Sequence, residues 1–214
     1  NGGKKWNLIY SNNHPEIFLD GIDFWNKKQG IIYGDPIGGH LTLLKTNDGG
    51  ESWELSDSKY TPEIFPGEAS FAASGTTIRC DDDKKVWIGT GGIHARLLYS
   101  DDQGKTWKAK TPAMIQGKPT QGIFSIAINK KGRIILTGGD FENPEQSTGN
   151  NLFSDDGGNT WMTPQTTTQG YRSCVEFLSE YNLIAVGPTG GELSTDGGNI
   201  WTSIPDAPNG NTIR

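Results

Sequence analysis

The chain has 214 residues, which is enough for one domain or two small ones with a buried core. It contains 19 Lys and Arg against 25 Asp and Glu, a formal net charge of −6, so no nucleic-acid partner is expected. No apolar run approaches the roughly 18 residues of a membrane-spanning helix, and no membrane span is expected. The 30 glycines are about twice the usual share, which predicts many tight turns.

A motif of the form S/T-x-D-x-G-x-x-W occurs four times and organises the chain. Residues 1–6 resemble the end of a fifth copy, with Asn1 in the Asp position. Asp can accept backbone N–H groups across a turn, and Gly two residues later can adopt a positive φ, so each box is predicted to be a structural turn between two strands. The box positions are Asp48, Gly50 and Trp53; Asp102, Gly104 and Trp107; Asp156, Gly158 and Trp161; and Asp196, Gly198 and Trp201.

Four short strands are predicted around each box, in the same order each time. No segment has sustained helical periodicity, so helices are expected to be minor. Four antiparallel strands in a tandem repeat of 40 to 54 residues predict an all-β fold, a β-propeller of four-stranded antiparallel blades. In chain order the predicted strands are 19–25, 30–33, 41–45 and 53–55; 71–78, 85–89, 95–99 and 107–110; 122–128, 133–137, 151–154 and 161–163; and 173–178, 183–186, 191–194 and 201–204.

The repeat also predicts the domain organisation, a single propeller domain over 1–214. At about 49 residues per blade the chain holds about 4.4 blades, whereas a closed ring needs a whole number. We therefore expect a piece of a six- or seven-bladed ring, truncated at both ends; four blades closed by a redundant outer strand is the alternative. The blade repeats are expected at about 7–55, 56–109, 110–163 and 164–204.

The four boxes in register resemble the Asp-box, or BNR-repeat, propellers. This superfamily includes sialidases, xyloglucan-active glycoside hydrolases, sortilin-type receptors and photosystem II stability/assembly factors. The nearer resemblance is to bacterial propellers similar to the assembly factors, some of which carry an oxidoreductase label. That label has no support here, because the sequence lacks a strand-linked GxGxxG, a CxxC pair and a haem motif. The nearer resemblance is carried by FLDGIDFW at 18–25, YGDP at 33–36, EASFAASGT at 68–76 and GYRSC at 170–174.

The boxes lie on one rim in this superfamily, and alternating strand directions then bring the other loops to the opposite rim, which is the predicted binding face. A glycosidase needs two carboxyl groups across a cleft, and the candidate catalytic residues on this rim are Asp35, Glu68 and Asp140. The candidate ligand-binding residues are His40, His94, Arg96, Tyr171 and Arg172. Further polar residues expected on this rim are His14, Glu16, Asp20, Glu63, Gln121 and Glu142.

Two functions stay open. The first is a non-catalytic binding or assembly module with a glycan or protein partner on this rim, although the net negative charge differs from the basic patch associated with assembly factors. The second is a glycoside hydrolase, sialidase-like or xyloglucanase-like, with carboxylate acid/base residues there. The sialidase resemblance implies three arginines that hold the substrate, but only Arg96 and Arg172 are expected on this rim.

No cofactor and no metal are predicted. His14, His40 and His94 lie in separate loops without ligand spacing, and the three Asp residues at 81–83 lack the spacing of a calcium loop, so a solvated turn is expected there. Cys80 and Cys174 form no CxxC pair, and Cys174 is expected to be buried and inert. The resemblance implies a secreted or periplasmic bacterial protein, while the chain begins with Asn rather than Met and its first five residues lack the apolar core of a signal peptide.

Overall fold

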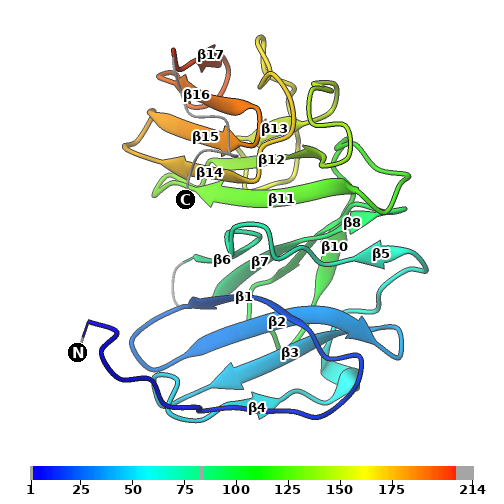
Figure 1. Cartoon of the computed structure of the whole chain (residues 1–214). Helices are drawn as coiled ribbons and strands as arrows, with labels where there is room; N and C mark the ends of the chain where they lie inside the picture. The colour runs from blue at the N-terminus through cyan, green and yellow to red at the C-terminus, as the bar shows by residue number, and fades with distance from the viewer. Residues whose placement is uncertain (1, 82–83, 206–214) are drawn as a thin grey trace.

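The computed structural model describes residues 2–81 and 84–205, and these residues form an all-β fold. The one helix among them is a short 3-10 turn, η1 (Ser58–Tyr60). Figure 1 shows the sheets stacked face to face in chain order, from the blue N-terminal sheet to the orange C-terminal sheet at the other end of the stack. The predicted fold class, blades of antiparallel strands, is confirmed.

Four antiparallel sheets make up the stack. The first runs in the order β1 (Leu19–Phe24), β2 (Gly30–Ile37), β3 (His40–Thr46), β4 (Glu54–Leu55). The second contains β6 (Ile78–Asp81), β7 (Lys85–Gly89), β9 (Leu97–Ser100) and β10 (Lys108–Lys110). The third contains β11 (Gln121–Ile128), β12 (Ile134–Asp140) and β13 (Asn151–Ser154), extended at its inner edge by β8 (Gly91–Gly92) and β5 (Glu68–Ala69). The fourth contains β14 (Cys174–Phe177), β15 (Leu183–Gly187), β16 (Gly190–Ser194) and β17 (Thr202–Ser203).

The hydrophobic core consists of three clusters of buried side chains. Because side chains alternate between the two faces of a strand, each inner sheet can bury apolar residues against both of its neighbours. Ile31 and Val86 belong to the cluster between the first and second sheets, Leu97 and Ile126 to the next, and Ile135 and Val175 to the last. Burial of each such side chain contributes roughly 1.5–3 kcal/mol, so the contacts between sheets hold the stack together.

Two predicted strands differ from the structure. The strand predicted over 71–78 begins only at Ile78, because Gly75 adopts a φ of +70° and the Ser74 and Thr76 hydroxyls bond each other at 2.6 Å, which favours a turn. The strand predicted over 161–163 is reduced to one bridge between Met162 and Phe153. Pro164 follows directly and has no N–H to extend the pairing.

The four boxes form the same turn. The Ser or Thr that begins each box accepts a hydrogen bond from the N–H of the box glycine at 2.8–3.0 Å and donates one to the box Asp at 2.7–2.9 Å. The box Asp in turn accepts the N–H four residues further on at 2.8–3.0 Å. Two consecutive residues with positive φ occupy the turn, and in one box the first of them is Gln103 at +61°. Each box Asp is therefore occupied in holding its own turn.

The N-terminal residues repeat this local geometry without its packing. Gly2 and Gly3 have φ values of +62° and +75°, and a Cβ on Gly3 would lie 3.6 Å from the Trp6 ring, as one on Gly50 would from Trp53. Trp6 is nevertheless 87% exposed, whereas Trp201 is 3% exposed. The turn therefore depends on local sequence, and burial of its tryptophan depends on a neighbouring sheet.

Candidate functional site

The loops opposite the boxes come from all four sheets, and we call them the loop rim; they lie on the right in Figure 1. Backbone hydrogen bonds join consecutive loops, for example from Gly117 N–H to Gly92 O (3.0 Å) and from Phe141 N–H to Thr120 O (3.2 Å). Tyr171 N–H likewise donates to Pro144 O (2.8 Å), so the rim is one connected surface. Its segments are 12–20, 34–41, 61–70, 90–96, 115–121, 138–150, 168–173 and 187–192.

The net charge of the chain resides on the loop rim. Nine carboxylates lie in its segments, against one Lys and two Arg, which gives a net charge of −6. The remaining sixteen carboxylates of the sequence are matched by sixteen Lys and Arg. The nine are Glu16, Asp20, Asp35, Glu63, Glu68, Asp140, Glu142, Glu145 and Glu192.

Glu68 and Arg96 form a buried ion pair. Arg96 Nε donates to both carboxylate oxygens of Glu68 at 2.9 Å, and its Nη2 donates to Oε2 at 2.7 Å. Thr90 donates a further hydrogen bond to Glu68, and the Arg96 guanidinium lies 4.0 Å from the centre of the Phe65 ring. Both charged side chains are thus fully engaged with each other, an arrangement that fixes the loops rather than leaving either group free for a ligand.

Arg172 forms a second buried ion pair, with Glu192 on β16. Arg172 and Glu192 are each 1% exposed, and the guanidinium donates to both carboxylate oxygens. Its remaining N–H groups donate to Tyr171 O and Thr189 Oγ1, both at 2.8 Å. The sequence analysis did not select Glu192, because a lone Glu inside a predicted strand gives no signal of its partner in another loop.

Asp140 is also buried and hydrogen-bonded. Gln121 Nε2 donates to its Oδ2 at 3.0 Å, and the Glu142 N–H donates to its Oδ1 at 3.1 Å. Burial acts to raise the pKa of Asp140, but hydrogen bonds to the charged form outweigh it, and the pKa lies below its ordinary value. Lys118 Nζ lies 3.9 Å away at the surface. Asp140 is therefore a charged residue that anchors the long loop after β12.

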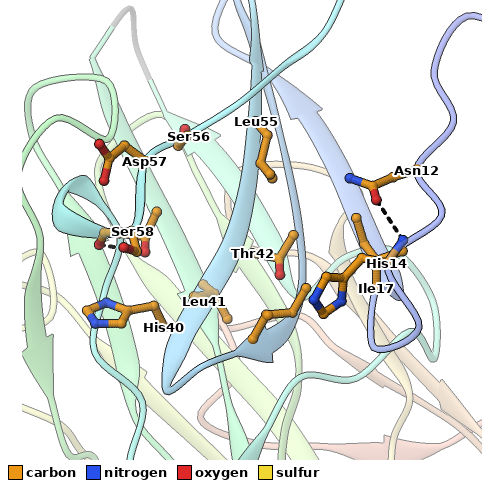
Figure 2. Close-up of a pocket in the computed structure, with 12 residues that line it drawn as sticks. Asn12, His14, Ile17, His40, Leu41, Thr42, Leu55, Ser56, Asp57 and Ser58 are labelled. Carbon is orange, nitrogen blue, oxygen red and sulfur yellow. Dashed lines mark hydrogen bonds between the residues drawn. The ribbon is translucent and has the colours of Figure 1, made fainter.

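The histidines do not converge on one site. His94 packs edge-to-face on Phe65, with ring centres 5.3 Å apart. His14 and His40 lie on opposite sides of a pocket of about 360 Å³, with Leu41 and Thr42 between them (Figure 2). His14 Nδ1 accepts the Glu16 N–H at 3.2 Å. Across residues 2–81 and 84–205, no three His, Cys, Asp or Glu are grouped so that they could hold a metal ion.

Asp20 and Asp35 form a pair of carboxylates at the ends of β1 and β2. The register of β1 with β2 shifts between Leu19 and Gly21, and that of β2 with β3 shifts between Gly34 and Pro36, so both Asp residues occupy bulges. Bulges turn a side chain away from the regular alternation of a strand. Asp20 is 9% exposed and its Oδ2 has no hydrogen-bond partner among the described residues; Asp35 is half-buried.

This pair has unusual proton affinity. Burial, and after it the charge of Asp35, raise the pKa of Asp20 from its ordinary value of 3.8 to about 7. Burial also raises the pKa of Asp35, although the Ser70 N–H opposes the shift by donating to its carboxylate. The two groups are therefore a carboxyl that can hold a proton near neutral pH beside one that is more readily ionised.

Aromatic side chains adjoin the carboxylate pair. Phe71 stacks on Phe124 with ring centres 4.1 Å apart, and Phe141 meets both rings edge-on at 6.4 and 6.1 Å. Tyr171 packs edge-on against Phe124 at 4.8 Å and is buried, which raises its pKa to about 12. Tyr33 Oη, whose ring lies between the two Asp-bearing segments and the second sheet, donates to Phe71 O at 3.1 Å. Phe141 is 45% exposed, so the cluster presents an aromatic surface to solvent.

The remaining expectations concern the cysteines, the acidic turn and the membrane. Both cysteines are unpaired and half-buried, and Cys174 accepts a hydrogen bond from Thr76 Oγ1 at 3.8 Å, so it is less buried than expected. Asp82 and Asp83 of the acidic turn lie outside the described residues. No helix in the described part of the chain is long and apolar enough to span a membrane.

Comparison with known proteins gives one family match and many structural ones. The family described as BNR/Asp-box repeat matches residues 98–109. No functionally curated protein has a similar sequence. A GH74 enzyme from Niastella koreensis is similar in structure, with a TM-score of 0.65 and 17% identity over 90% of this chain and 30% of its own.

Two further structures come from different functional classes. YCF48 from Cyanidioschyzon merolae has a TM-score of 0.55 and 19% identity over 89% of this chain and 56% of its own. A sialidase from Trypanosoma rangeli has a TM-score of 0.51 and 16% identity over 86% of this chain and 36% of its own. The chain thus spans about a third to a half of the length of these structures. With its repeated boxes and its stacked antiparallel sheets, the chain is built as an Asp-box β-propeller.

Proposed function

We propose that the chain is a non-catalytic binding or assembly module that holds a glycan or protein partner on the loop rim. The state of the rim carboxylates carries this proposal. Of the three candidate catalytic residues, Glu68 and Asp140 are buried and engaged by neighbouring groups, and only Asp35 retains partial exposure. A glycosidase needs two carboxyl groups that both reach the scissile bond, and those three do not supply them.

The rim instead has the properties of a preformed recognition surface. Its loops are tied together by backbone hydrogen bonds and by two buried Arg–Glu pairs, so little ordering is required on binding. Phe141 projects an exposed ring from this frame. The resemblance to bacterial Asp-box propellers extends the proposal to a secreted or periplasmic location.

The test is a binding screen combined with an activity screen. Immobilised protein is exposed to panels of oligosaccharides and peptides, and to chromogenic glycosides. We expect saturable retention of at least one compound without turnover, weakened by Phe141→Ala on the rim and unchanged in the box variant Asp101→Asn. Retention that is equally strong in both variants would contradict the rim as the site, and turnover would contradict the non-catalytic assignment.

The second candidate function, a glycoside hydrolase, is favoured by one observation. Asp20 and Asp35 form a carboxyl pair with separated proton affinities, the property that distinguishes a general acid from its ionised partner. In that case Asp20 donates the proton to the leaving oxygen, and Asp35 acts as the base or nucleophile. Turnover of a chromogenic glycoside that is lost in Asp35→Asn, with a rate that falls above about pH 7 in the unchanged protein, would establish this function.

A further inference from the structure

The charges on the loop rim are not balanced within the molecule. Arg96 and Arg172 are each taken up by a buried Glu, and Lys118 lies nearest to Asp140. Six rim carboxylates then have no ion-pair partner within the described part of the chain: Glu16, Asp20, Asp35, Glu63, Glu142 and Glu145. A surface with this field attracts cationic ligands and repels anionic ones.

Two buried polar atoms at the same place lack partners. Asp20 is nine-tenths buried, and its Oδ2 accepts no hydrogen bond from any described residue. Ser70, whose N–H donates to Asp35, is 7% exposed, and its Oγ likewise has no partner in the described chain. Buried polar groups are normally satisfied, so these two atoms indicate a missing donor beside the carboxylate pair.

An aromatic surface continues from this point. Ser70 is followed by Phe71, whose ring contacts Phe141, and Tyr33 bonds the Phe71 carbonyl. Ammonium and guanidinium groups are attracted to ring faces as well as to carboxylates. A neutral sugar could stack on Phe141 but would leave all six carboxylates uncompensated, so the combination favours a cation.

We propose that the surface formed by Asp20, Asp35, Phe71 and Phe141 binds a lysine- or arginine-bearing segment of a protein partner. This inference rests on the proposed binding function and specifies the partner's chemistry. The cationic group lies between the two carboxylates and donates to Asp20 Oδ2, while its aliphatic stem packs on the exposed edge of the aromatic cluster.

The test measures fluorescence anisotropy of two labelled peptides, one of alternating glycine and lysine and one with glutamate in place of lysine. We expect the lysine peptide to bind and the glutamate peptide not to, with affinity that weakens as salt is raised. The double variant Asp20→Asn with Asp35→Asn is expected to weaken binding about tenfold. It removes a repulsive pair, so it folds at least as well as the unchanged protein.

The matched control is Glu51→Gln with Asp101→Asn, which removes the same charge from the box rim, where both side chains are exposed. We expect it to leave the affinity for the lysine peptide within about twofold. Equal loss in the two double variants, or equal binding of the two peptides, overturns the inference. If neither peptide binds but an oligosaccharide is retained through Phe141, the cationic partner is wrong and the binding function stands; retention of no compound removes both.

Discussion

The carboxylates of the two rims have opposite environments. At the boxes, hydrogen bonds from Ser52 at Asp48 and from Thr160 at Asp156 stabilise the charged form and hold the pKa well below its usual range. On the loop rim, burial and a neighbouring carboxylate raise the pKa of Asp20 to about 7. The same side chain therefore stabilises one rim as an anion and destabilises the other.

This difference indicates different roles for the two rims. A carboxylate that accepts hydrogen bonds from its own turn has its requirements met by residues within the box, and adding a ligand would displace them. A buried carboxylate without donors is satisfied only by a proton or by a group from outside. Destabilising arrangements of this kind are concentrated at functional sites.

The largest expected effect comes from breaking a buried ion pair on the loop rim. Arg172→Ala leaves Glu192 buried without its partner and is expected to lower the free energy of unfolding by about 3–5 kcal/mol, measured by urea denaturation. Replacing both residues, with Arg172→Met and Glu192→Leu, is expected to recover most of this loss. A single variant that loses less than about 1 kcal/mol would contradict the pairing.

The next effect has the opposite sign. Because the pKa of Asp20 is raised in the fold, the unfolded chain loses this proton first, and the residue reduces stability as pH rises from about 4 to about 7. Asp20→Asn is expected to raise the free energy of unfolding by up to about 4 kcal/mol at pH 8 and to change it little at pH 4. Denaturation at both pH values measures this, and a destabilised variant at pH 8 would contradict the assignment.

A box variant should lose a smaller amount of stability. Asp102→Ala removes hydrogen bonds from Ser100, Lys105 and Thr106 and is expected to cost about 1–2 kcal/mol. The neighbouring Asp101→Ala, which removes an exposed ion pair with Lys108, is expected to change stability by less than about 0.5 kcal/mol. The contribution of Asp102 is present near neutral pH and is lost as the carboxylate is protonated in acid, so the two Asp variants should become equal there.

The smallest effect is expected at the partial box. Trp6→Ala removes a ring that is 87% exposed and should change thermal stability by less than about 0.5 kcal/mol. Trp201→Ala, at the equivalent position of the last box, removes a buried ring and serves as the positive control, with an expected loss of about 3–5 kcal/mol. Similar losses at both positions would show that Trp6 is covered in solution.

Local patterns account for what could be predicted. The box turns follow from Ser or Thr, Asp and Gly at fixed spacing, and hold even at Gly2 and Gly3, where the tryptophan is not buried. The strands follow from apolar runs between turns, and the prediction is wrong where hydroxyls and Gly75 make a turn of their own or where Pro164 ends an edge. Both errors arise because several local preferences compete within a few residues.

The sequence by itself determined the repeat, the turn chemistry and the all-β blade architecture, since each depends on residues close together in the chain. Tertiary structure alone decided which charges meet. Arg172 is neutralised by Glu192 and Arg96 by Glu68 because loops from separate hairpins converge on one rim. Asp20 and Asp35 are left unpaired because two shifts of strand register turn them together into a buried position, and register depends on pairing across the whole sheet.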